Sequence, residues 1–115
     1  MAREFPGSVA YTVSADRFKG PTRLIERVVT VGVGPTEILQ NNPRRVFWSL
    51  MNRSVNNGAI GFTTQVTFAT GFYLTAGGGN VSMAVEEDGE SVGYAVYGIQ
   101  DVLAGNWYVI EVEGV

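Results

Sequence analysis

Two residue types that carry much of enzyme chemistry are missing from this sequence of 115 residues. It contains no cysteine, which excludes disulfides and thiolate chemistry, and no histidine, the commonest general base and a frequent zinc ligand. Without histidine, a Ser-His-Asp triad cannot be assembled from the many serines and threonines. We therefore expect a protein that is not an enzyme, that has no catalytic residues and that needs no metal or other cofactor.

Charged residues are also scarce, at 17% of the chain against a usual share of about 25%. The net charge is −3, and Lys19 is the only lysine among the eight basic residues. Nucleic acid is therefore not an expected partner, because non-specific binding to phosphates needs a surplus of cations. The preference for arginine suits bidentate contacts that exclude water. It is equally compatible with a GC-rich genome or a hot habitat.

Long apolar runs are absent as well. No run reaches the roughly 18 residues of a membrane span, and the first residues lack the apolar core of a signal peptide. The sequence therefore predicts a soluble protein that is made in the cytoplasm and has no membrane partner. Its length is that of one domain with one modest hydrophobic core.

The chain is rich in glycine, which together with proline ends or interrupts strands. Fifteen glycines and four prolines separate short segments rich in Val, Ile, Phe, Tyr and Thr, which is typical of an all-β chain. We expect about eight strands between Leu24 and Val112, in a single β-sandwich or jelly-roll-like domain that spans residues 24–115. The pattern predicts no helix and no internal repeat.

The most apolar expected strand runs from Arg44 to Arg53. Alternation places Val46, Trp48 and Leu50 on one face and Phe47 and Met51 on the other. A strand that is apolar on both faces is either central in a sandwich or covered by another subunit. Phe47 and Met51 are therefore candidate partner-binding residues.

Two turn signals predict hairpins. Asn56-Asn57-Gly58 contains the Asn-Gly pair that supplies the positive φ angles of a two-residue turn, and Asp88-Gly89 is a similar signal. The last expected strand runs from Asn106 to Val112. Its alternation predicts Tyr108, Ile110 and Val112 inward, with Glu111 and Glu113 outward.

Residues 1–23 differ in composition from the remainder and predict an extended N-terminal arm, with one short strand at Val9–Val13. A terminal segment of this kind is normally disordered unless something holds it, either its own domain or a neighbouring molecule, and we favour a neighbour. Isolated aromatic side chains bury a large area at little entropic cost. Phe5, Tyr11 and Phe18 are therefore the candidate anchors of the arm.

The acidic cluster Glu86, Glu87, Asp88 and Glu90 is a candidate metal or catalytic site. Its spacing does not fit a calcium loop, and neighbouring turn residues rarely flank a cleft as a glycosidase pair does. A solvated hairpin tip is the favoured interpretation, with a calcium site shared between subunits as the alternative. Gly77-Gly78-Gly79 leads into a strand rather than into Gly-Lys-Ser/Thr and a helix, so it does not predict a phosphate-binding loop.

Arg44 and Arg45 stand at the start of the most apolar strand. They could grip carboxylates or phosphates of a partner, which makes them candidate binding residues. The alternative is that they pair with acids of their own chain. Trp48 and Trp107 are expected in the core, although a tryptophan with Tyr73 and Tyr97 could form a sugar-binding surface.

A set of motifs between Asn41 and Ile99 carries a resemblance. They are Asn42-Pro43-Arg44-Arg45-Val46-Phe47 through Asn52, Asn56-Asn57-Gly58, Ile60-Gly61-Phe62, Gly71-Phe72-Tyr73-Leu74, Gly77-Gly78-Gly79, Glu87-Asp88-Gly89-Glu90 and Ala95-Val96-Tyr97-Gly98-Ile99. This block resembles small all-β structural proteins of tailed bacteriophages, which occur in the virion as capsid decoration (cement) proteins or minor head components. The motifs are turn and core signatures, and the arm lies outside them.

The resemblance implies a virion protein that contacts the major capsid protein or other virion subunits, and a homo-oligomer, with a trimer favoured. The leading hypothesis is thus a non-enzymatic capsid decoration protein. One alternative is a carbohydrate- or receptor-binding module of a phage spike or fibre, which predicts exposed aromatics in a groove. Another is a hydrolase, which predicts a pocket with two carboxylates, one of them with a raised pKa.

Overall fold

A computed structural model describes residues 21–114 of the chain, and these residues form an all-β fold. The strands are β1 (Thr22–Val31), β2 (Thr36–Leu39), β3 (Arg45–Asn52), β4 (Gly58–Gly61), β5 (Phe72–Leu74), β6 (Asn80–Ala84), β7 (Val96–Gln100) and β8 (Gly105–Gly114). A short helix α2 (Val85–Asp88) and a 3-10 turn η1 (Gly89–Gly93) follow β6. The expected all-β class is confirmed.

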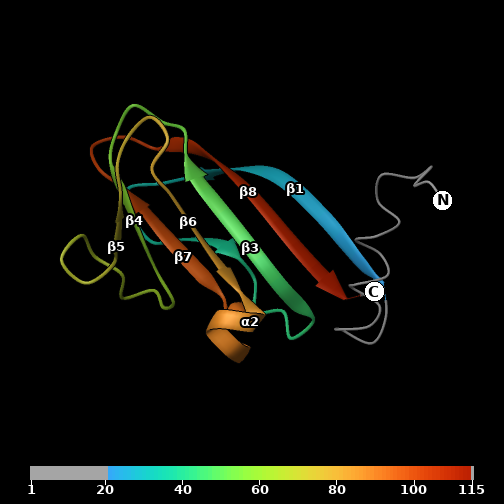
Figure 1. The fold of residues 1–115 in the computed structure, drawn as a ribbon. Coiled ribbons are helices and arrows are strands. Elements are labelled where there is room, and N and C mark those ends of the chain that lie inside the picture. Colours follow the sequence, from blue (N-terminus) through green and yellow to red (C-terminus); the bar gives the residue numbers. More distant parts are fainter. Residues whose placement is uncertain (1–20, 115) are drawn as a thin grey trace, which may run out of the picture.

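The strands form two four-stranded sheets in which all paired neighbours are antiparallel. Sheet A has the order β1-β8-β3-β6, and sheet B has the order β2-β7-β4-β5 (Figure 1). The long strands β1 and β8 pair without interruption from Thr22 opposite Gly114 to Val31 opposite Gly105. β1 therefore begins at Thr22, and Thr22 and Arg23 belong to the sheet rather than to the segment before it.

The hydrophobic core lies between the two sheets, as a β-sandwich requires. Both sheets contribute fully or nearly fully buried side chains, as does η1. The buried core residues are Val31, Ile38, Leu39, Trp48, Leu50, Ile60, Leu74, Val92, Val96, Trp107 and Val109. Each large apolar side chain in such a position contributes about 1.5–3 kcal/mol relative to an exposed one.

Asn56-Asn57-Gly58 does not form the expected hairpin, because β3 and β4 belong to different sheets. The glycine is required for packing rather than for a turn. A Cβ at position 58 would lie 2.4 Å from Cζ2 of Trp107, so only a glycine lets the buried indole approach this strand. The Asn-Gly pair predicted the wrong connection because close packing and turn geometry select the same residue type.

The expectation of a second hairpin at Asp88-Gly89, and of no helix, is also wrong. The chain makes the single turn α2, which ends at Gly89 with φ 64°, and then η1. The Asp88 carboxylate accepts a hydrogen bond from the backbone N–H of Ala84 at 2.9 Å. A helix of four residues is too short to show a helical hydrophobic period, so the sequence could not reveal it.

The facing of β8 is the reverse of the expected one. Trp107, Val109 and Glu111 point inward and are buried, while Tyr108 and Ile110 lie on the outer side and are partly exposed. A shift of one residue in the alternation exchanges the two faces of a strand. The alternation misleads here because it treats a glutamate as an outward residue, and Glu111 is instead neutralised inside the fold.

Candidate functional site

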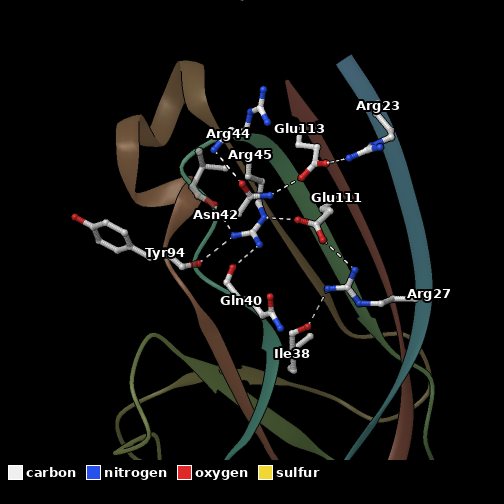
Figure 2. Close-up of polar contacts among 11 residues, drawn as sticks. Arg23, Arg27, Ile38, Gln40, Asn42, Arg44, Arg45, Tyr94, Glu111 and Glu113 are labelled. Carbon is white, nitrogen blue, oxygen red and sulfur yellow. Dashed lines mark hydrogen bonds and ion pairs between the residues drawn. The ribbon is translucent and has the colours of Figure 1, made fainter. Parts of the chain in front are cut away.

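A charge cluster formed by Arg27, Arg45 and Glu111 lies on the inner face of sheet A, with Arg45 and Glu111 buried and the Arg27 side chain 36% exposed. Arg45 Nε donates to Glu111 Oε2 at 2.7 Å, and Arg27 Nη1 donates to Glu111 Oε1 at 2.9 Å (Figure 2). Arg45 and Glu111 are only 3% and 5% exposed. Both oxygens of this carboxylate are thus occupied by guanidinium groups of the same chain.

Other guanidinium donors of the cluster bind backbone carbonyls outside sheet A. Arg45 donates to the carbonyls of Gln40, Val92 and Tyr94 at 2.6, 3.3 and 3.2 Å. Arg27 donates to the carbonyl of Ile38, in β2, at 3.2 Å (Figure 2). The cluster therefore ties sheet A to β2 and to the segment that leads into β7.

A second carboxylate lies beside the cluster, towards the end of β8. Glu113 accepts hydrogen bonds from the Arg23 guanidinium and, at 2.6 Å, from Asn42 Nδ2 (Figure 2). Asn42 also accepts the backbone N–H of Arg44 through Oδ1 at 3.0 Å. These contacts fasten the chain before β3 to the β1–β8 pair.

A polar cleft of about 610 Å³ opens beside these groups, and its lining includes Arg27, Glu37, Gln40, Arg45, Glu111 and Glu113. Burial tends to raise the pKa of the Glu111 carboxyl, but hydrogen bonds and positive charge from Arg45 and Arg27 outweigh this and hold the pKa below its ordinary value. Hydrogen bonds from Arg23 and Asn42 likewise lower the pKa of Glu113. Neither group has the raised pKa that a general acid needs at neutral pH. Glu111 and Glu113 therefore do not supply the raised pKa that the hydrolase hypothesis predicts.

The structure separates the arginines that the sequence proposed as partner-binding residues. Arg45 is directed inward, and four of its five N–H donors bind acceptors of its own chain. This arrangement is the intramolecular pairing that the sequence left as the alternative. Arg44 is exposed on the surface. The signal that sequence analysis missed is Glu111, which its alternation placed outside.

Phe47 and Met51 both lie on the outer face of sheet A, the side opposite the core. Register places Leu24, Val112 and Phe47 in one row across three strands, and Val28, Tyr108 and Met51 in another. Between these rows, Glu26 lies beside Ile110 and Ser49. This set of nine residues from β1, β8 and β3 is called the outer apolar face below.

The outer apolar face carries little charge. Glu26 is its only charged residue, and Tyr108 donates a hydrogen bond to the Glu26 carboxylate at 2.8 Å. Leu24 and Val28 are 61% and 64% exposed, and no described residue covers them. Exposed apolar groups that adjoin one another on a sheet are typical of a surface that binds another molecule.

The free edge of β1 borders the outer apolar face. β1 is ten residues long and stands at the end of sheet A, as Figure 1 shows, so only one of its sides is paired among the described strands. The other edge strands are shorter: β6 has five residues, β2 has four with a bulge, and β5 has three. Natural proteins blunt edge strands by shortness or bulges, and β1 has neither.

The acidic cluster of the sequence lies on α2 and the second residue of η1, not at a hairpin tip. Within residues 21–114, no group of three or more acidic side chains is gathered in a way that could hold a metal ion. None of the helices in this part of the chain is long and apolar enough to cross a membrane.

The tryptophans and tyrosines divide between core and surface. Trp48 and Trp107 are fully buried, which confirms their expected place in the core and removes them from any sugar-binding surface. Tyr97 packs against a small buried cluster formed by sheet B and the loop after β4. Tyr73 is exposed, and it makes an edge-to-face contact with Phe68 at 6.2 Å between ring centroids. The candidate arm anchors Phe5, Tyr11 and Phe18 lie outside the described residues.

Comparison with known proteins adds little to this geometry. No family model matches the chain, and no curated protein matches it. A solved chain from the disulfide-linked pili of Bacillus endospore appendages is similar, with a TM-score of 0.49 and 10% sequence identity over 82% of this chain and 87% of that one. A similarity at this level carries no argument about function.

Proposed function

We propose that this chain is a non-enzymatic structural protein of a virus particle, a decoration (cement) protein that stabilises the head of a tailed bacteriophage. The observation that carries the proposal is the outer apolar face, where Phe47 and Met51 share a surface with the exposed Leu24 and Val28. The resemblance of residues 41–99 to phage decoration proteins supplies the setting. The partner is then the major capsid protein or another virion subunit.

The chemistry of the described residues supports a binding role. Glu111 and Glu113 are occupied by arginines, and the pKa of each carboxyl is lowered rather than raised. A binding surface needs exposed apolar area and few charges, which the outer apolar face provides. Many copies on a capsid lattice make individually weak contacts collectively strong.

The experiment is co-sedimentation of the purified full-length chain with capsids of the virus that carries its gene, prepared without the chain. We expect the wild-type chain to sediment with the capsids. Phe47→Asp places a charge on the outer apolar face and should weaken binding at least tenfold. Thr64→Asp, in the exposed loop between β4 and β5, is the matched control and should bind as the wild type does. No binding by the wild type, or equal binding by both variants, contradicts the proposal.

The predicted arm is tested in the same assay. Replacing Phe5, Tyr11 and Phe18 together with alanine should leave the melting temperature of the domain unchanged and reduce capsid binding. The described core between the sheets consists of residues 31–109, so we expect the domain to fold without these three side chains. Capsid binding equal to that of the wild type would show that the arm is not an anchor.

A second candidate function is a carbohydrate- or receptor-binding module of a spike or fibre. A specific observation favours it: Phe72 and Tyr73, on the edge strand β5, are 59% and 55% exposed, and Phe68 lies beside Tyr73. A shallow groove of about 360 Å³ adjoins Phe72. Phe72→Ala separates the two functions, because it should abolish glycan binding by such a module and leave capsid binding intact.

A further inference from the structure

Among the described residues, the free edge of β1 lacks several devices that normally keep an edge strand from pairing. It has no proline within its ten residues, no bulge in its pairing with β8, and no lysine. Its arginines, Arg23 and Arg27, form ion pairs with Glu113 and Glu111 of β8. Its one acid, Glu26, is held by Tyr108. An edge of this length and neutrality is a template for another strand.

We propose that two copies of this chain pair through their β1 edges, antiparallel about a two-fold axis, so that sheet A continues from one copy into the other. This inference does not rest on the proposed function. A second copy is the favoured occupant because it supplies a strand of equal length with its own free edge. Pairing β1 with the free edge of β6 would use at most the five residues of β6, and the edges of sheet B are shorter still.

Charge selects the register of this pairing. Residues directly opposite each other in an antiparallel pair share a face, and like charges placed opposite are destabilising. If Glu26 or Arg27 lay on the two-fold axis, it would face its own copy. If Ile25 lay there, Arg23 would face Arg27. Each of these three registers therefore opposes like charges.

With Val28 on the axis, seven residues of each strand pair and no like charges lie directly opposite each other. Glu26 then lies opposite Thr30 of the second copy, and Arg27 lies opposite Val29. Registers centred on Leu24 or Val29 also avoid like charges, but each pairs only five residues of β1. The register centred on Val28 is thus the longest that charge allows. It also buries Val28, which is 64% exposed in the single chain.

The first test compares two lysine substitutions on the outer face of β1. Val28→Lys places two ammonium groups side by side on the axis, whereas Leu24→Lys changes a similarly exposed residue just outside the paired stretch. By analytical ultracentrifugation of the full-length chain, we expect a wild-type dimer, at least tenfold weaker dimerisation for Val28→Lys, and a change of less than twofold for Leu24→Lys. Neither position contributes to the core, so both variants should fold.

The second test uses the natural absence of cysteine. In the proposed register, the side chains of Val28 from the two copies lie about 5 Å apart. Those of Leu24 lie eight residues apart along the strands, or about 27 Å at 3.4 Å per residue. A bis-maleimide with a spacer of about 8 Å should therefore cross-link Val28→Cys into dimers and leave Leu24→Cys monomeric.

Several outcomes overturn the proposal. A wild-type chain that stays monomeric at high concentration shows that the β1 edge does not pair with a second copy. A trimer, which the phage resemblance favours, shows a different symmetry. Equal loss of association in Val28→Lys and Leu24→Lys points to packing through the whole outer face. These results concern self-association, whereas the proposed function fails only if capsid binding fails.

Discussion

The two faces of sheet A treat their polar and apolar groups in opposite ways. The inner face buries Arg45, Glu111 and Asn52, and the side-chain polar groups of all three are hydrogen-bonded within the chain. The outer face has Glu26 as its one charge and leaves Leu24 and Val28 open. The polar residues of the inner face join the two sheets. The exposed apolar residues of the outer face are not covered by any described residue.

From this difference we predict that stability and association depend on separate surfaces of one sheet. Polar side chains at both ends of β3 make hydrogen bonds to residues outside sheet A. At the start is the charge cluster of Arg45, and at the end Asn52 Nδ2 donates to the carbonyl of Leu74 at 3.1 Å. Substitutions on the inner face should therefore change the free energy of unfolding. Substitutions on the outer face should change binding instead.

The largest expected effect comes from Arg45→Met. It leaves Glu111 buried with one arginine partner, and it removes the donors to three backbone carbonyls. Removing one partner of a buried ion pair costs about 3–5 kcal/mol. Urea unfolding at pH 7 measures this loss. If Arg45→Met unfolds at the same urea concentration as the wild type, the cluster does not hold the sheets together.

Glu113→Gln is the matched control for the charge cluster. Its ion pair with Arg23 is largely open to solvent, because the Arg23 side chain is 60% exposed. Exposed pairs contribute up to about 1 kcal/mol. A loss as large as that of Arg45→Met would mean that burial does not set the difference between the two pairs.

The two buried tryptophans differ in the hydrogen bonding of their indole N–H groups. Trp107 Nε1 donates to Gln100 Oε1 of sheet B at 2.8 Å, whereas Trp48 Nε1 has no partner among the described residues. Each change to phenylalanine removes part of a buried side chain, but only Trp107→Phe also leaves a buried acceptor unpaired. We expect Trp107→Phe to cost about 1–3 kcal/mol more than Trp48→Phe. Equal costs in urea unfolding would contradict this role of the Trp107–Gln100 bond.

Low pH should reduce the free energy of unfolding, and part of this loss should depend on Glu111. Its pKa is lowered in the folded chain from an ordinary value of 4.5, so the folded state favours the ionised form. This contribution is complete above pH 4.5 and is lost as the pH falls through the lowered pKa of the folded state. We expect Glu111→Gln to be less stable than the wild type at pH 7 and to lose less stability below pH 4.5. A parallel acid dependence in both proteins would exclude Glu111 as the source.

Much of the fold can be predicted from the sequence, because the alternation of apolar and polar residues along a strand and the glycines between strands are local signals. The strand around Trp48 and the last strand around Trp107 were both predictable. The connections were not. Gly58 serves the packing of Trp107 rather than a turn, and this requirement arises from a strand 49 residues further along the chain.

The inward direction of Glu111 was hidden for a similar reason. A buried carboxylate is stable only where its partners lie, and Arg27 and Arg45 reach it from two other strands. Alternation within β8 therefore assigned the wrong face. The place of Phe47 and Met51 on the face opposite Trp48 was predictable, because apolar residues on both faces of one strand are visible in the sequence itself. Leu24 and Val28 were missed because their exposure depends on the strand order.

The smallest effect is expected for a leucine on the outer face of sheet A, and a leucine on the inner face provides the comparison. Leu24 is exposed on the outer face, whereas Leu50 is buried in the core. Leu24→Ala should change the free energy of unfolding by less than about 0.5 kcal/mol, as surface substitutions usually do. Leu50→Ala should cost about 2–5 kcal/mol, since it removes buried methyl groups and leaves a cavity. Urea unfolding of both variants at a concentration where the chain is monomeric gives the comparison directly. A loss for Leu24→Ala that approaches the loss for Leu50→Ala would mean that the outer face is covered within the single chain, and the separation between a stabilising face and a binding face would fail.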